Sequence, residues 1–233
     1  MSALKTPQKT SKRQELRQDS IVTLYAKAWM FYEENRNLVY GALAGLVALA
    51  LGIVGYAYYQ AQQQEQAQQL LAQVVNTYEQ GSYQQALDGT AETLGLLEIA
   101  DEYGGTQAGN LATFYAADAL YRLGEFDRAL TYFQQFDKTN DLIGASALAA
   151  EAAIYESREE FATAAEHYQD AANQFESDLT TPRYLMDAGR AYAEAGDYEQ
   201  ALEIYQTIKQ EYSESEQAQN IDRFIAQVRA QQQ

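Results

Sequence analysis

The chain has 233 residues, with 16 Lys and Arg, 33 Asp and Glu, and a formal net charge of −17. Residues 60–233 hold nine basic and 29 acidic side chains, and this strong negative charge excludes nucleic acid and anionic lipid as expected ligands. The absence of cysteine excludes disulfides and thiolate chemistry. The acidity either keeps the protein soluble, in a salty habitat for example, or serves a basic partner.

The first 37 residues are basic, with seven Lys and Arg against four Asp and Glu. Residues 1–18 are polar without apolar periodicity, which predicts a disordered cytoplasmic tail. Residues 19–37 carry apolar side chains at helical spacing, which predicts an amphipathic helix on the membrane surface. A helix docked on a partner's cytoplasmic loop would give the same pattern. The periodic residues are Ile21, Leu24, Tyr25, Ala28, Phe31 and Tyr32.

Residues 38–59 contain no charged side chain and no proline. A helix of this length reaches about 33 Å, enough to cross a bilayer, and a core helix would carry a polar face. Tyrosines at both ends suit the two membrane interfaces. The basic residues precede the span, and none follows it before Arg122, so we expect a cytoplasmic N-terminus and an external domain. A cleaved signal peptide would have a shorter apolar region, so we expect an uncleaved anchor.

Small residues recur within this segment at spacings of four, three, four and three, which places them on one helix face. Such a stripe lets a second helix approach closely, although glycine and alanine are also common in membrane helices. The stripe therefore predicts a contact with another helix, either from a second copy of the chain or from a different protein. The stripe comprises Gly41, Gly45, Ala48, Gly52 and Gly55.

A short phrase recurs in the rest of the chain, where an aromatic residue is followed three positions later by alanine. The phrase occurs at Tyr83/Ala86, Phe126/Ala129, Phe161/Ala164 and Tyr198/Ala201, at spacings of 43, 35 and 37 residues. Glycine precedes three of the four aromatics by two positions, where a turn would need a positive φ, but Glu159 replaces it in the third unit. We expect a connecting helix and a degenerate first repeat over 60–109, three repeats over 110–214, and a capping helix over 215–233.

This pattern resembles the tetratricopeptide repeat, a helical hairpin that stacks into a solenoid. The last unit matches best, from Gly189 through Tyr192 and Gly196 to Tyr205, although the family's tryptophan and terminal proline are missing. The predicted fold is therefore all-α: one N-terminal transmembrane helix followed by an α-solenoid of tetratricopeptide-like hairpins. The resemblance implies a peptide groove along the first helix of each hairpin. Its mapped residues are Phe114, Asp118, Tyr121, Arg122, Arg183, Met186 and Arg190.

The layout as a whole resembles the bacterial ancillary SecYEG translocon-subunit family (YfgM-like). That resemblance implies a single-pass protein of the bacterial inner membrane with a periplasmic domain. It also implies protein partners, namely translocon subunits, periplasmic chaperones or unfolded exported chains. The alternatives are a scaffold or assembly subunit of another inner-membrane complex, and a cell-wall-associated binding protein favoured by the many tyrosines.

No pattern typical of an active site occurs in the sequence. There is no P-loop, nucleophile elbow, HExxH motif or cysteine, and His167 is the single histidine. A lone histidine cannot form a multi-histidine metal site, and we expect a structural or surface role for it. We therefore expect an interaction protein, not an enzyme, with no cofactor and no metal.

Overall fold

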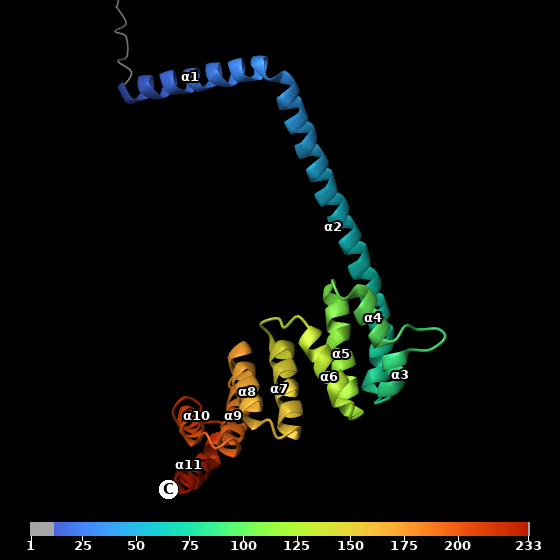
Figure 1. Ribbon diagram of the computed structural model, residues 1–233, viewed down its shortest axis with the longest axis vertical. Helices are drawn as coiled ribbons and strands as arrows, with labels where there is room; N and C mark the ends of the chain where they lie inside the picture. Colours follow the sequence, from blue (N-terminus) through green and yellow to red (C-terminus); the bar gives the residue numbers. More distant parts are fainter. Residues whose placement is uncertain (1–11, 233) are drawn as a thin grey trace, which may run out of the picture. The chain divides into compact units, whose positions relative to one another are not determined.

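The computed structural model describes the backbone of residues 12–232 and the side chains of residues 23–232 (Figure 1). The chain divides into two compact units, Met1–Tyr59 and Gln60–Gln233. Over the described residues the structure is helical and contains no strand, apart from one isolated bridge between Gly89 and Leu94. The all-α prediction is thereby confirmed.

The first unit contains helix α1 (Lys12–Glu34) and the start of helix α2 (Arg36–Glu79). Helix α1 begins inside the segment predicted as a disordered tail, because Gln, Glu, Leu and Arg after Lys12 are good helix formers. Residues 1–11 lie outside the described residues. The predicted amphipathic helix over residues 19–37 falls on α1 and the first residues of α2, and its place on a membrane surface stays a prediction. A turn at Asn35, whose side-chain amide donates to the carbonyl of Phe31 over 3.1 Å, separates the two helices.

Helix α2 runs for 44 residues without a break, from the apolar segment into the second unit. Among the described residues it is the one helix long and apolar enough to cross a membrane. The rest of the described chain buries none of its most apolar part. Further along the same helix, Ala67, Leu71 and Val74 are buried in the domain core. The connecting helix predicted from residue 60 is thus the second part of α2, and it belongs to the domain.

The second unit is a row of antiparallel helical hairpins (Figure 1). A short helix α3 and an additional helix α4 follow α2, then three hairpins (α5–α6, α7–α8 and α9–α10) and a terminal helix α11 preceded by a single 3₁₀ turn. The bounds are α3 Tyr83–Asp88, α4 Leu96–Tyr103, α5 Gln107–Arg122, α6 Phe126–Gln135, α7 Leu142–Ser157, α8 Phe161–Gln174, α9 Thr181–Glu194, α10 Tyr198–Glu211 and α11 Ile221–Gln231.

The turn between α2 and α3 and the turns inside the three hairpins share one backbone conformation. Gly81, Gly124 and Gly196 have φ of 78°, 79° and 82°, and Glu159 takes the same left-handed conformation with φ 61°. In each turn the next N–H reaches back five residues, as in the bond from Glu125 to the carbonyl of Leu120. The repeat phrase therefore marks the same turn four times, including once without glycine.

Close helix contacts hold each hairpin together. A Cβ added to Gly189 on α9 would lie 2.4 Å from a ring carbon of Tyr205 on α10, so the two helices need glycine here. The corresponding Ala117 and Ala152 are fully buried in the preceding hairpins. Burial raises the pKa of Tyr205 to about 12, because its phenolate would be poorly solvated between the helices.

Candidate interaction surfaces

The predicted groove residues on α5 lie together, and α2 and α3 contact two of them, Asp118 and Arg122. The hydroxyl of Tyr78 on α2 donates to the carboxylate of Asp118, which also pairs with Arg122. The guanidinium of Arg122 lies 5.4 Å from the ring centroid of Tyr83 on α3. Burial and the bond to Asp118 raise the pKa of Tyr78. Asp118 is thus held by α2, whereas Arg122 contacts α3 and stays about half exposed.

The aromatic residues mapped to α5 are also packed within the domain. The ring of Phe114 has its centroid 6.0 Å from that of Phe133 and 5.5 Å from that of Phe136. The centroid of Tyr121 lies 5.4 Å from that of Phe126 at the start of α6. These ring contacts pack α5 against α6 and the residue that follows it.

The predicted groove residues on α9 are two exposed arginines and one partly buried methionine. Arg190 pairs with Glu156 of α7 at 3.1 Å and with Asp187 of its own helix at 3.4 Å. Arg183 lies over the ring of Tyr184, 4.9 Å from its centroid, and Met186 is partly buried against the core. Burial raises the pKa of Asp187, and the nearby Arg190 opposes that shift. A peptide-binding groove along the first helices therefore stays a prediction, and its exposed members are the arginines of α5 and α9.

A buried carboxylate joins the two helices of the α7–α8 hairpin to the segment between α6 and α7. The side chain of Glu151 on α7 is 3% exposed, and Lys138 Nζ lies 2.8 Å from its Oε1 in an ion-pair geometry. His167 Nδ1 on α8 lies 3.2 Å from its Oε2. Burial alone would raise the pKa of Glu151, but the bonds from His167 and Lys138 outweigh it and lower the pKa. The single histidine thus lies in a structural ion cluster.

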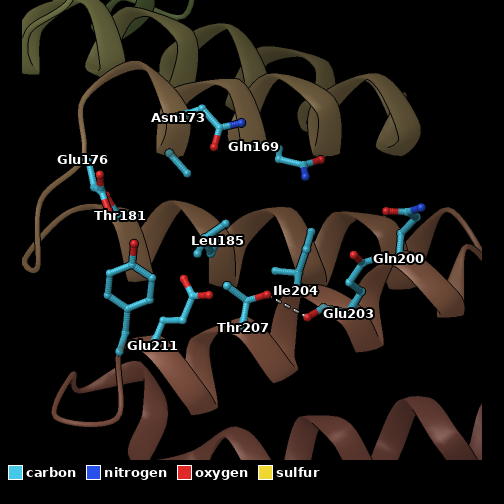
Figure 2. Close-up of a pocket in the computed structure, with 12 residues that line it drawn as sticks. Gln169, Asn173, Glu176, Thr181, Leu185, Gln200, Glu203, Ile204, Thr207 and Glu211 are labelled. Atoms are coloured by element: carbon cyan, nitrogen blue, oxygen red, sulfur yellow. Dashed lines mark hydrogen bonds between the residues drawn. The ribbon is translucent and has the colours of Figure 1, made fainter.

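A separate groove lies between the second helices of the last two hairpins, and the sequence did not predict it. Figure 2 shows Gln169 and Asn173 on α8 facing Glu203 and Thr207 on α10, with Leu185 of α9 between them. The groove has a volume of about 360 Å³. Its remaining lining residues are Ala172, Glu176, Thr181, Gln200, Ile204, Glu211 and Tyr212. We refer to it as the α8–α10 groove.

Among the described residues, nothing packs against the glycines of the α2 stripe. A Cβ placed on Gly41, Gly45, Gly52 or Gly55 meets no atom within 4 Å beyond the adjoining helix backbone. Contact of this stripe with another membrane helix remains a prediction. Within the described part of the chain, no group of three or more His, Asp or Glu side chains is arranged to hold a metal ion.

Repeated hairpins with a shared turn and small residues between paired helices define a helical-repeat protein. The family model described as a tetratricopeptide repeat-like domain matches residues 27–151, more than half of the chain, so the protein belongs to that family. A second model, described as a tetratricopeptide repeat, matches residues 184–215. A comparison with curated proteins finds no match. Repeats of this class are generally non-catalytic modules that bind other proteins, which assigns this chain to protein–protein interaction.

Proposed function

We propose that the protein is a membrane-anchored interaction module of the bacterial inner membrane, with its repeat domain on the periplasmic side. There it assists exported proteins at the exit of the SecYEG translocon, together with periplasmic chaperones. The basic residues before the apolar segment and their absence until Arg122 support this orientation. The translocon assignment is supported by the resemblance of the layout to the ancillary subunit family.

The continuity of α2 is the observation that carries this proposal. One helix supplies both the exposed apolar segment and buried domain residues, such as Leu71 and Val74. Removing the second half of the helix would therefore also remove part of the domain core. An interaction domain that shares a helix with an apolar segment of this kind supports a function at a membrane.

The test is affinity isolation of the tagged full-length protein from membranes solubilised in mild detergent. We expect translocon subunits and periplasmic chaperones in the isolate, and their loss when residues 60–233 are deleted. Recovery of a different membrane complex that survives this deletion would contradict the export role.

A scaffold role in another inner-membrane complex is the second candidate, and the open glycine stripe favours it. The double variant Gly45→Leu/Gly52→Leu fills that stripe and leaves the repeat domain unchanged. A scaffold function would lose its membrane partners in this variant, whereas partners held by the repeat domain would be retained.

A further inference from the structure

The α8–α10 groove combines an apolar floor with an acidic rim. Ala172, Leu185 and Ile204 supply the floor, one from each of the three helices. Glu176, Glu203 and Glu211 supply carboxylates along the rim (Figure 2). Amide side chains of Gln169, Asn173 and Gln200 provide further donors and acceptors.

A second depression of about 310 Å³ extends this surface. It shares Glu211 and Tyr212 with the groove and adds Asp178 and Glu214 to the acidic rim. Burial raises the pKa of Tyr212, and the negative charges of Glu176, Glu211 and Asp178 raise it further. The negative charges therefore gather at the end of the groove where Tyr212 lies.

No cation of the domain neutralises this rim. Within the described residues, no Lys, Arg or His lies at ion-pair distance from Glu176, Glu203 or Glu211. The three basic residues of α9 and α10 make other contacts: Lys209 with Asp222 at 2.6 Å, Arg190 with Glu156, and Arg183 with the ring of Tyr184. Helix α8 carries no Lys or Arg. The carboxylates are thus free to pair with a cation from outside.

We propose that the α8–α10 groove is a docking site for a basic segment of a partner protein, with Lys or Arg on the acidic rim and small apolar side chains on the floor. Charge complementarity selects this occupant, because acidic peptides and anionic lipids would be repelled by the uncompensated carboxylates. The groove lies between second helices, so it is distinct from the predicted peptide groove along the first helices. The site does not depend on the translocon role.

The test uses the full-length chain in nanodiscs of zwitterionic phosphatidylcholine. The probe is a fluorescein-labelled 12-residue peptide that alternates lysine and alanine, and binding is followed by fluorescence anisotropy. The variant Glu203→Lys/Glu211→Lys reverses two rim charges. The matched control Glu98→Lys/Glu102→Lys makes the same change of net charge on exposed positions of α4.

We expect the rim variant to weaken binding by about ten-fold or more and the control by less than about two-fold. The milder variant Glu203→Gln/Glu211→Gln should weaken binding in the same direction by a smaller factor, which guards against loss of folding in the charge reversal. Raising the salt from about 0.05 M to about 0.5 M should also weaken binding. Equal losses in rim and control variants, absence of binding, or equal affinity for a glutamate–alanine peptide would overturn the proposal.

Discussion

Carboxylates in the first-helix layer of the hairpins differ from those in the α8–α10 groove. Asp118, Glu151 and Glu156 each pair with a cation of the domain, namely Arg122, Lys138 and Arg190. Glu203 and Glu211 line a groove and have no such partner among the described residues. The negative charge of the repeat domain therefore has two separate uses: one set of carboxylates holds hairpins together, and the other remains available at the surface.

This difference bears on whether the acidity serves solubility or partner choice. A carboxylate kept only for solubility can lie anywhere on the surface. The unpaired carboxylates of the groove instead border apolar residues such as Leu185 and Ile204. Substitutions in the two sets should therefore affect different measurements, stability for the first set and binding for the second.

The largest loss of stability is expected for Glu151→Gln. The substitution keeps the shape of the side chain but leaves the largely buried ammonium of Lys138 without its counter-charge. Breaking a buried ion pair from one side costs about 3 kcal/mol in free energy of unfolding. Urea unfolding of the full-length protein, followed by circular dichroism, measures the change.

The double variant Glu151→Leu/Lys138→Met is the control for this prediction. It removes both charges, so most of the lost stability should return. A change of less than about 0.5 kcal/mol in Glu151→Gln would show that the cluster does not join the hairpins.

The pH dependence of stability follows from the same cluster. The pKa of Glu151 is lowered in the folded protein from its ordinary value of 4.5. Its contribution is therefore fully present above about pH 4.5 and is lost as the pH falls through the folded-state pKa. Unfolding free energies between pH 6 and pH 3 should fall more steeply in the wild type than in Glu151→Gln. Parallel curves would assign the acid sensitivity to other groups.

A smaller effect is expected for Tyr78→Phe. The substitution removes the hydroxyl that donates to Asp118 and leaves the ring contacts with Tyr83 and Tyr115 in place. Loss of one partly buried hydrogen bond to a charged acceptor costs about 1 to 2 kcal/mol. Urea unfolding measures this loss, and an unchanged stability would mean that α2 is not bound to α5 through this contact.

The smallest effect on stability is expected for Glu203→Gln/Glu211→Gln. Both side chains are exposed and unpaired, so the free energy of unfolding should stay within about 0.5 kcal/mol of the wild type. Urea unfolding provides the measurement. A loss comparable to that of Glu151→Gln would remove the distinction between the two sets of carboxylates.

Local rules made much of the fold predictable from the sequence. Glycine two positions before an aromatic residue needs a positive φ, and alanine three positions after it fits a close helix contact. Both features recur at Gly124 and Ala129, and the structure shows the expected turn and burial there. Helix α4 has no counterpart in the repeat, so its position between α3 and α5 could not be predicted from the recurring pattern.

The surfaces were harder to predict because they depend on which helices cover them. The groove positions predicted for α5 all fall on one helix, but whether they bind a peptide stays a prediction. Tyr78 lies 40 residues before Asp118, and no spacing rule links the two. The α8–α10 groove draws on three helices between Gln169 and Tyr212. In the sequence the groove is marked only by acidic residues near the ends of α8 and α10. Acidic residues are common at exposed helix ends, so they do not by themselves predict a groove.

The orientation across the membrane is the central claim, and the lack of cysteine allows a direct measurement. Single-cysteine variants Ser11→Cys and Ser213→Cys would be treated with a membrane-impermeant maleimide in intact cells stripped of their outer membrane. We expect labelling of Ser213→Cys in intact cells and of Ser11→Cys only after lysis. The reverse pattern would place the repeat domain in the cytoplasm and contradict an export role.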